Sequence, residues 1–452
     1  MPDRLSARAT LALVTDDFTE LPHPARRAGD PDGPLAWQGY RASRARAADR
    51  TGEDESVVCG TARVEGTEAV LIAFEFGFLG GSLGERTGDR LQAAYTHARD
   101  HRLPVVALIA TGGSRMQEGM VALAQLQRVA RQSVLLREAG LAQLAVLRDP
   151  TTGGGWATLG AGADVVLALP GAQVGFAGSR VRPADADPAA YTAEAQVAAG
   201  AADAVVHPEE LRRTLGRWLR LLTGPSAEPA PPPRPLGATG LPASGWEAVL
   251  RARSPQRPRA HHYLDAYFTE RVTIGGDRCG GTDGGMLCGF GAHAGRTVAY
   301  AAQTGTATRP AGYRTAARLI RLADRLGIPV LTLVDTPGAA NDAEAERQGA
   351  GAAIADVFGA VAAARTPVTT LVIGEGGSGG ALALAAPGNT WATPDSYFSV
   401  IAPELATAIL KRPPQEVRST AGQLRLRPQD LAELGLARTS GRLFPGTGDR
   451  HP

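Results

Sequence analysis

Residues 366–382 read TPVTTLVIGEGGSGGAL. The first half of this stretch is a short, β-branched, apolar run, which is typical of a strand buried on both faces. The second half carries five glycines between Gly374 and Gly380. Because glycine permits tight turns and close backbone approach, this composition favours a strand that leads directly into a helix. The stretch therefore predicts a buried parallel strand, a glycine turn and a helix start.

The same order of elements recurs in the chain. Similar apolar runs occupy Leu103–Ile109 and Ile328–Val334, and they end in glycine at Thr111-Gly112-Gly113 and Thr336-Pro337-Gly338. Each run also follows a stretch of helical periodicity, of which Tyr313–Leu326 is the clearest. A repeated order of helix, buried strand and glycine turn predicts an α/β fold in both halves of the chain.

The length and one change of composition predict the domain organisation. A chain of 452 residues is too long for a single ordinary core. Between Thr223 and Arg259 the sequence becomes rich in proline, which favours extended chain over packed elements. We therefore predict two domains, residues 1–222 and 259–452, joined by a Pro-rich linker of residues 223–258.

Composition excludes several functional classes. The net charge of +2, without a basic block, argues against a nucleic-acid partner. Lys411 is the single lysine among 47 basic residues, and it lies in no motif for a P-loop, a pyridoxal Schiff base or a biotin attachment site. Any biotin must therefore arrive on another protein, and any ATP-driven step must occur elsewhere.

Metal binding and membrane insertion are not expected either. The three cysteines, Cys59, Cys279 and Cys288, lack the spacing of a zinc ribbon or of a disulfide framework. Neither a secretory signal nor an apolar segment of membrane-spanning length is recognisable. We therefore expect no bound metal, no membrane partner and a cytoplasmic protein.

Two glycine turns carry the chemistry that we predict. Gly112-Gly113-Ser114 and Gly379-Gly380-Ala381 each run from a strand into an apparent helix, where unbonded backbone N–H groups and the helix dipole can hold an oxyanion. The alternative is that these glycines only permit tight packing of strand against helix. No convincing Ser/His/Asp set accompanies them, so two oxyanion holes would serve substrates that bring their own base.

Nine motifs in order then resemble one known family. Four in the first half resemble the β subunit of acetyl-CoA carboxylase carboxyltransferase, and five in the second half resemble its α subunit. They are Phe78–Gly84, Gly112–Gly119, Asp149–Gly154, Gly175–Gly178, Gly276–Arg278, Pro310–Arg314, Asp335–Ala339, Gly374–Leu382 and Ser399–Glu404. The resemblance implies an α/β protein of two crotonase/ClpP-like domains, each built of repeated ββα units.

The resemblance also implies a reaction. The first half would bind acyl-CoA and the second carboxybiotin, with the reaction at their interface. Backbone N–H groups at Gly112 and Gly113 would hold the thioester carbonyl and its enolate, and those at Gly380 and Ala381 would hold the ureido oxygen of biotin. Carboxybiotin would release CO2, its ureido nitrogen would take the α-proton of acetyl-CoA, and the enolate would attack CO2. The product, malonyl-CoA, would feed fatty acid or polyketide synthesis.

Further residues and partners follow from the same resemblance. Biotin would be supplied on a biotin carboxyl carrier protein that a biotin carboxylase loads, and the fused chain would form a homodimer equivalent to α2β2. The other matched motifs would provide the residues that bind the CoA thioester and biotin. These are Gly80, Gly81, Arg115, Gly153, Gly154, Phe176, Ala177, Gly338, Gly376 and Gly377.

The sequence departs from the family pattern at a few positions. The chain lacks the four-cysteine zinc ribbon with which many β subunits begin. Ser114 replaces an alanine, Trp156 replaces a smaller apolar residue, and Pro183–Thr192 lacks the usual acidic and aromatic pattern, so the acyl-chain preference is open. With one lysine in the chain, an arginine would have to bind the CoA phosphates. The candidates are Arg86, Arg115 and Arg180.

Three alternatives remain at the level of sequence. A biotin-independent malonyl-CoA or malonate decarboxylase would share the fold and lose CO2 without using biotin. A crotonase-like hydratase or hydrolase would need two carboxylates over the thioester, for which Glu118 and Glu375 could be proposed, although each fits better as a helix-start residue that complements the helix dipole. A catalytically silent scaffold of a carboxylase complex is the third.

Overall fold

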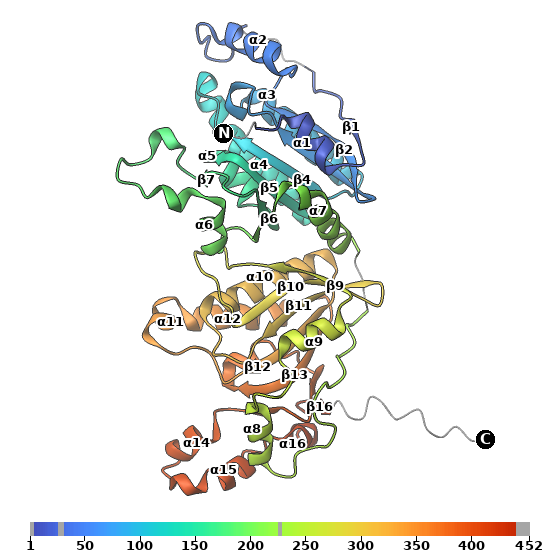
Figure 1. The fold of residues 1–452 in the computed structure, drawn as a ribbon, viewed down its shortest axis with the longest axis vertical. Helices are drawn as coiled ribbons and strands as arrows, with labels where there is room; N and C mark the ends of the chain where they lie inside the picture. Colours follow the sequence, from blue (N-terminus) through green and yellow to red (C-terminus); the bar gives the residue numbers. More distant parts are fainter. Residues whose placement is uncertain (1–3, 26–30, 225–227, 440–452) are drawn as a thin grey trace, which may run out of the picture. The chain divides into compact units, whose positions relative to one another are not determined.

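The computed structural model describes residues 4–25, 31–224 and 228–439. The chain divides into two compact units. Unit 1 comprises Met1–Thr223 together with the short segment Arg278–Gly281, and unit 2 comprises Gly224–Asp277 and Thr282–Pro452. Each unit contains one sheet with helices packed on it (Figure 1).

Unit 1 is built on an eight-stranded mixed sheet in the order β1-β2-β3-β4-β5-β6-β8, with β7 paired to β5. Strands β1 to β3 are antiparallel, and from β3 to β8 the neighbours are parallel. The strands are β1 Asp17–Glu20, β2 Val57–Val64, β3 Thr67–Phe74, β4 Val105–Thr111, β5 Gln143–Thr152, β6 Val165–Ala168, β7 Val174–Gly175 and β8 Ala204–Val205. The helices are α1 Ala7–Val14, α2 Tyr40–Thr51, η1 Leu79–Gly81, α3 Glu85–Asp100, η2 Met116–Glu118, α4 Gly119–Glu138, α5 Gly153–Gly155, η3 Trp156–Gly160, η4 Ser179–Val181, η5 Pro188–Tyr191, α6 Ala193–Ala198 and α7 Pro208–Leu222.

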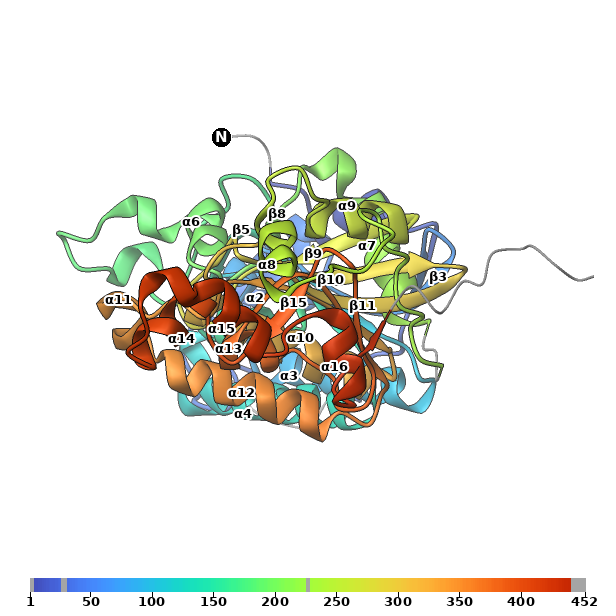
Figure 2. The ribbon, with the colours of Figure 1, turned by 90° about the horizontal axis from the view of Figure 1, so that it is seen from below.

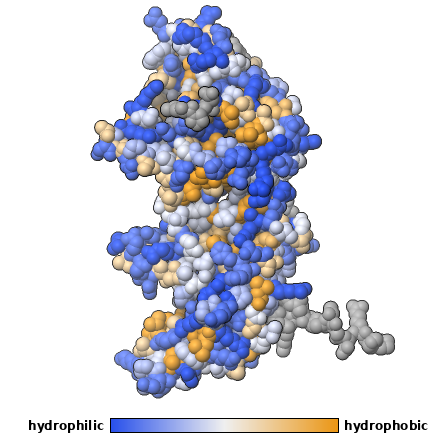
Figure 3. Space-filling view, in the orientation of Figure 1, coloured by the Kyte–Doolittle hydropathy of each residue, from blue (hydrophilic) through white to orange (hydrophobic). Residues whose placement is uncertain are grey.

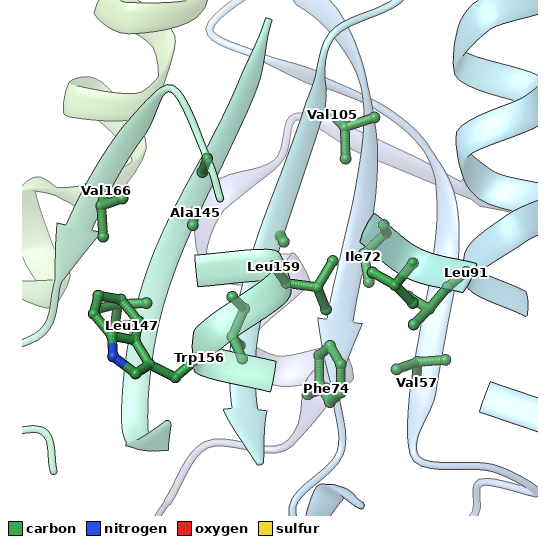
Figure 4. Packing of buried hydrophobic residues seen from close by; sticks show 14 of the residues in the cluster. Val57, Ile72, Phe74, Leu91, Val105, Ala145, Leu147, Trp156, Leu159 and Val166 are labelled. Atoms are coloured by element: carbon green, nitrogen blue, oxygen red, sulfur yellow. The ribbon is translucent and has the colours of Figure 1, made fainter. Parts of the chain in front are cut away.

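The core of unit 1 forms where α3, α4 and η3 pack on the sheet. Alternate residues of the central strands, such as Ile72 and Phe74, point to the same face because side chains alternate along a strand. Leu91 of α3 and Leu159 of η3 meet them there (Figure 4). Trp156 belongs to this cluster and is 8% exposed, so the larger residue noted in the sequence fills core space.

Unit 2 repeats this plan with an eight-stranded sheet in the order β16-β14-β13-β12-β11-β10-β9, with β15 paired to β13. The strands are β9 Glu270–Ile274, β10 Met286–His293, β11 Arg296–Gln303, β12 Val330–Thr336, β13 Val368–Gly377, β14 Thr390–Ala392, β15 Tyr397–Ser399 and β16 Arg438–Thr439. The helices are α8 Gly245–Arg253, α9 Ala260–Tyr267, α10 Pro310–Leu326, α11 Ala343–Arg347, α12 Ala350–Ala363, α13 Ser378–Leu382, α14 Pro403–Ile409, η6 Pro414–Glu416, α15 Val417–Gln423 and α16 Pro428–Glu433.

Helix α10 shows why the predicted elements form. Pro310 occupies its first turn, where no N–H is needed, and Gly327 ends it in the left-handed region at φ 70°. Its apolar side, including Leu319 and Ile320, is buried, and α12 packs beside it (Figure 2). The predicted amphipathic helix over Tyr313–Leu326 is therefore confirmed, and so are the three predicted buried strands, as β4, β12 and β13.

The two sheets share an internal repeat of constant spacing. Strand β4 pairs with β5 from Val105↔Gln143 to Thr111↔Thr151, and β12 pairs with β13 from Val330↔Val368 to Thr336↔Gly376. Each residue of β12 and β13 follows its counterpart in β4 or β5 by the same number of positions in the sequence, as Val330 follows Val105 and Gly376 follows Thr151. In both sheets the strand register shifts just before the last of these residue pairs. Elements from β4 to α5 therefore correspond to those from β12 to α13.

The segment predicted as a linker is not extended chain throughout. Residues 228–258 belong to unit 2 and contain the nine-residue helix α8, which contacts β13, β15 and α15. Ser244 caps this helix through a hydrogen bond from the N–H of Glu247 at 3.1 Å, and Ala248 and Val249 are fully buried. The high proline content predicts extended chain, but the segment also contains a short capped helix with its own apolar face.

The surface is mixed, with apolar side chains gathered around α14. Val400, Leu405 and Ile409 are 72%, 56% and 67% exposed, and hydrophobic surface shows over this part of unit 2 (Figure 3). Among the helices of the described residues, none combines the length and the hydrophobicity that crossing a bilayer would require.

Candidate active site

Three glycine turns of unit 1 lie against one another. The N–H of Gly112 donates to the carbonyl oxygen of Gly80 at 2.9 Å. A Cβ atom on Gly81 would lie 2.1 Å from the backbone at the end of β4, and one on Gly153 would lie 3.1 Å from the Cα atom of Gly113. Only glycine permits such approaches. The structure thus brings together predicted site residues from η1, from the turn after β4 and from α5.

The start of α5 supplies backbone donors in unit 1. The N–H of Gly153 donates to the carbonyl oxygen of Phe176 at 3.0 Å, which brings the predicted Phe176-Ala177 segment to the same turn. Gly154 and Gly155 occupy the first turn of the helix, where N–H groups have no intrahelical acceptor. These two N–H groups are the oxyanion donors that the geometry of unit 1 favours.

The prediction that Gly112 and Gly113 begin a helix with unbonded N–H groups is wrong. Helix α4 starts only at Gly119, after the 3-10 turn η2. Besides the bond from Gly112 to Gly80, the N–H of Gly113 donates to the hydroxyl of Thr111 at 3.0 Å. Ser114 forms a bridge with Leu83. This turn therefore packs against the start of α5 and does not itself present a helix N-terminus.

In unit 2 the corresponding turns also meet. A Cβ atom on Gly377 would lie 2.0 Å from the carbonyl oxygen of Pro337. One on Gly380 would lie 2.6 Å from the backbone nitrogen of Ala339. Gly338 lies in the left-handed region at φ 147°, and its N–H donates to the hydroxyl of Thr336 at 3.2 Å, as that of Gly113 does to Thr111.

Helix α13 presents the donors of unit 2. It begins at Ser378 after β13, of which Gly376 and Gly377 are the last residues, and Gly379 and Gly380 complete its first turn. The N–H groups of a first turn have no intrahelical acceptor. Gly379 and Gly380 therefore remain candidate donors, and the donor role predicted for Ala381, the fourth residue of α13, stays a prediction.

The repeat corrects which turns correspond. Gly379 and Gly380 follow Gly154 and Gly155 at the same offset along the chain that relates the residues of β5 to those of β13. The sequence predicts that Gly379–Gly380 correspond to Gly112–Gly113, but in the structure the counterpart of Gly112–Gly113 is Pro337–Gly338. Backbone angles agree with the structural pairing, since Gly153 has φ 62° and its counterpart Ser378 has φ 59°.

Arg115 cannot bind CoA phosphates as predicted. Its side chain is fully buried, and it forms an ion pair with Glu55 and donates to the hydroxyl of Tyr40 at 3.1 Å. Burial alone would lower the pKa of Arg115, but the charge of Glu55, the hydrogen bond to it and the nearby Tyr40 and Glu118 together raise the pKa above its ordinary value. Burial likewise would raise the pKa of Glu55, and Arg115 holds it below its ordinary value. Arg115 is therefore a structural cation beneath the turns.

The other two arginine candidates differ from Arg115. The guanidinium of Arg86 donates to the carbonyl oxygens of Pro24 and Ala25 at 3.2 and 3.4 Å. Arg180 lies exposed on η4, close in sequence to Phe176, which is 74% exposed. Of the three candidates, Arg180 is the one whose exposure suits a phosphate ligand.

Glu118 and Glu375 both have hydrogen-bonding or ion-pair partners among the residues around them. They belong to different units, and each is bound within its own. Glu118 accepts from Tyr40 at 2.5 Å and from the N–H of Glu85, the first residue of α3, at 2.6 Å. It therefore complements the start of α3 and not that of its own helix. Glu375 lies within β13 and pairs with Arg253 at 2.8 Å.

No metal centre accompanies the glycine turns. Within residues 4–25, 31–224 and 228–439, no group of three or more His, Cys, Asp or Glu side chains is arranged to hold a metal ion. The donors at both turns are backbone N–H groups, which suit a developing oxyanion.

Sequence reasoning missed Gly155 and Ser378 at these turns, and also Tyr313 and Gln303 beneath α13. The signal for the first two was present, because Leu103-Pro104 and Ile328-Pro329 already show the offset of the repeat. Tyr313 lies in the matched motif Pro310–Arg314, which assigns it no role, and no sequence signal marks Gln303. Their hydroxyl and amide reach the carbonyl oxygen of Gly380 only in the folded unit.

Comparison with protein families agrees with the division of the chain into two units. A family model described as a carboxyl transferase domain matches residues 37–206. A second, described as acetyl co-enzyme A carboxylase carboxyltransferase-like, matches residues 242–439. The matches fall one in each half of the chain, in the order predicted from the nine motifs.

Individual relatives extend over most of the chain. The acetyl-coenzyme A carboxylase carboxyl transferase subunits beta/alpha of Saccharopolyspora erythraea is 38% identical, over 88% of this chain and 73% of that protein. The protein of the same name from Salinispora arenicola is 39% identical, over 96% and 81%. A probable biotin-dependent acyl-coenzyme A carboxylase beta3 subunit of Mycobacterium bovis is 34% identical, over 91% and 84%.

The fold also matches a solved structure. The transcarboxylase 12S crystal structure, with methylmalonyl-coenzyme A and methylmalonic acid bound, superposes with a TM-score of 0.78 at 20% identity and covers 96% of this chain and 86% of its own. The predicted crotonase-like architecture and the predicted resemblance are thus confirmed. The chain belongs to the acetyl-CoA carboxylase carboxyltransferase family, with a β-like half and an α-like half in one polypeptide.

Proposed function

We propose that this chain is the carboxyltransferase component of an acyl-CoA carboxylase and that it transfers a carboxyl group from carboxybiotin to acetyl-CoA to make malonyl-CoA. Residues 1–222 would act as the acyl-CoA domain and residues 259–452 as the carboxybiotin domain. The family fixes the class of reaction, and the names of relatives from Saccharopolyspora and Salinispora support acetyl as the acyl group.

One observation supports this function above others, namely the duplicated donor turn. Gly154 and Gly155 start a helix after β5 in unit 1, and Gly379 and Gly380 start one after β13 in unit 2. A transfer between two carbonyl-containing substrates develops negative charge on two oxygens, one on each substrate. Two sets of backbone donors, one in each unit, match that requirement.

The chemistry required of the chain is limited. Gly154 and Gly155 would donate to the thioester oxygen and stabilise the enolate that forms when the acyl α-carbon loses its proton. Gly379 and Gly380 would donate to the ureido oxygen and stabilise the charge that it gains as the carboxyl group leaves. Biotin supplies the carboxyl group and accepts the α-proton, so no side-chain base is needed. Each backbone donor of this kind stabilises the transition state by about 3 kcal/mol.

The assembly belongs to the same proposal. Biotin would arrive on a biotin carboxyl carrier protein, because the only lysine, Lys411, lies outside any biotin attachment motif. The chain would act as a homodimer equivalent to an α2β2 unit, with a biotin carboxylase as the enzyme that loads the carrier. Sedimentation equilibrium of the purified chain measures whether it forms a homodimer, and a monomer at micromolar concentration would contradict the proposed dimer.

The forward reaction tests the function. The purified chain is mixed with a carboxylated biotin carrier protein and with acetyl-CoA, propionyl-CoA or a long-chain acyl-CoA, and the carboxylated thioester is measured. We expect malonyl-CoA to form fastest. A clear preference for a longer acyl-CoA would replace acetyl-CoA as the substrate and keep the reaction, whereas transfer to none of them would contradict the proposal.

A further inference from the structure

Two side chains of unit 2 converge on one backbone oxygen at the proposed carboxybiotin turn. The hydroxyl of Tyr313 donates to the carbonyl oxygen of Gly380 at 3.0 Å, and the side-chain amide of Gln303 donates to the same oxygen at 3.2 Å. Tyr313 is 1% exposed and Gln303 is fully buried. Both bonds therefore form away from solvent, where a hydrogen bond is stronger and a missing one is costly.

The oxygen that they reach has no acceptor role within its own helix. Helix α13 spans only Ser378–Leu382, and the carbonyl oxygens of Gly379 and Ala381 accept from the residues that follow it. The carbonyl of Gly380 would be left unpaired in a buried position without Tyr313 and Gln303, since the last carbonyls of a helix lack intrahelical donors. The two side chains therefore satisfy this group and fix the peptide plane that contains it.

Further contacts hold the two donors themselves in place. The amide nitrogen of Gln303 also donates to Thr308 at 3.3 Å, and its amide oxygen accepts from the N–H of Asp335 at 3.3 Å. Burial raises the pKa of the Tyr313 phenol well above its ordinary value, so that the hydroxyl remains a donor at neutral pH. Tyr313 also lies directly under Gly380, because a Cβ atom there would be 2.5 Å from the hydroxyl.

We propose that Tyr313 and Gln303 are positioning residues that hold the Gly380–Ala381 peptide plane, and with it the first turn of α13, so that the N–H groups of this turn point at the ureido oxygen of biotin. This inference rests on the proposed function and names what sets the geometry of its second donor turn. A donor aimed before the reaction starts contributes most where charge develops, in the transition state. Loss of the anchor should consequently lower kcat more than it raises the KM for biotin.

Tyr313→Phe tests the inference, with Tyr300→Phe as a matched control. Both tyrosines are buried in unit 2, and each hydroxyl donates to a backbone carbonyl, that of Tyr300 to Val272 at 3.2 Å. The reverse reaction is followed as acetyl-CoA formation from malonyl-CoA with free biotin as acceptor, and kcat and the KM for biotin are measured together with the thermal midpoint. Gln303→Leu provides a second variant at the same oxygen.

We expect both tyrosine variants to lose similar stability, while Tyr313→Phe and Gln303→Leu alone lower kcat, by about 10-fold, with the KM for biotin changed less than twofold. Equal kcat in Tyr313→Phe and Tyr300→Phe would overturn the positioning role and leave the proposed function intact. A wild-type enzyme whose acetyl-CoA formation ignores biotin would overturn the proposed function, and the inference with it.

Discussion

At the scale of residues, Arg115 and Glu55 form an ion pair that is buried within unit 1. An arginine in a matched motif is a natural candidate for a phosphate ligand, but the fold encloses the side chain of Arg115. Its burial depends on Glu55, which is 60 positions earlier in the chain, and on Tyr40. Pairing over such distances is set by tertiary packing, which a single sequence does not record.

Replacing Glu55 should destabilise unit 1. Glu55→Gln leaves the Arg115 charge buried with Glu118 at 3.6 Å as its remaining carboxylate, so we expect a loss of about 3–5 kcal/mol in the free energy of unfolding at pH 7. Denaturant titration measures it. Glu68→Gln is the control, because Glu68 is 63% exposed and its pairing with Arg63 is loose, at 3.7 Å. Equal effects of both substitutions would contradict the structural role.

The same pair predicts a pH dependence. The pKa of Glu55 is lower in the folded chain than in the unfolded one, where it is about 4.3. Its contribution to stability is therefore fully present above that pH and is lost as the pH falls through the lower folded value. The stability difference between wild type and Glu55→Gln should shrink on acidification below about pH 4, and a difference that grows there would be the contrary result.

Gly153 offers a test of the acyl-CoA turn. Gly153→Ala places a Cβ atom 3.1 Å from Gly113 at φ 62°, and Gly66→Ala imposes a similar φ of 79° on a turn with open space around it. Both should lose about 1–2 kcal/mol from the left-handed backbone. Only Gly153→Ala should also lower kcat/KM for malonyl-CoA, by at least about 10-fold. Steady-state kinetics and thermal melts separate the two effects.

At the scale of elements, strands and helices were predictable, and the placement of turns relative to helices was not. Periodicity marked β4, β12, β13 and α10, because burial on both faces of a strand and on one side of a helix leaves a local pattern. The sequence does not predict that α4 starts as late as Gly119, since Gly112 and Gly113 resemble any strand-to-helix turn. In the structure the N–H groups of Gly112 and Gly113 bond to Gly80 and Thr111, so these glycines form a turn that precedes the helix.

Helix α13 should tolerate no side chain at Gly380. Gly380→Ala would bring a Cβ atom within 2.6 Å of the backbone of Ala339, which must shift with the first turn of the helix. We expect biotin-dependent turnover to fall about 100-fold. Gly359→Ala in α12 is the matched control, because nothing lies within 4 Å of its Cβ position. That variant should keep full activity and gain up to about 1 kcal/mol of stability. Comparable activity of the two variants would contradict the importance of this turn.

At the scale of the whole molecule, the division into two similar units was predictable from the proline-rich seam and the repeated strands. The structure of the seam itself was not, because Pro-rich composition hides helix α8 and its buried residues. Substitutions at two neighbouring residues of α8 test whether the helix packs on unit 2. Val249 is fully buried and Leu250 is 55% exposed.

Val249→Asp should therefore cost several kcal/mol of stability and make residues 245–253 sensitive to limited proteolysis, since it buries a charge. Leu250→Asp adds the same charge to solvent and should change the unfolding free energy by less than about 0.5 kcal/mol. Equal protease resistance in both variants would mean that α8 is not required to hold the seam on unit 2.

In the proposed function the two donor turns serve one biotin-dependent transfer. The most direct measurement is the initial rate of acetyl-CoA formation from malonyl-CoA by the wild-type chain as the concentration of biotin is raised from zero. We predict a rate near zero without biotin that rises and saturates as biotin is added. A rate that is already maximal without biotin would instead identify a malonyl-CoA decarboxylase and contradict the assignment of the second turn.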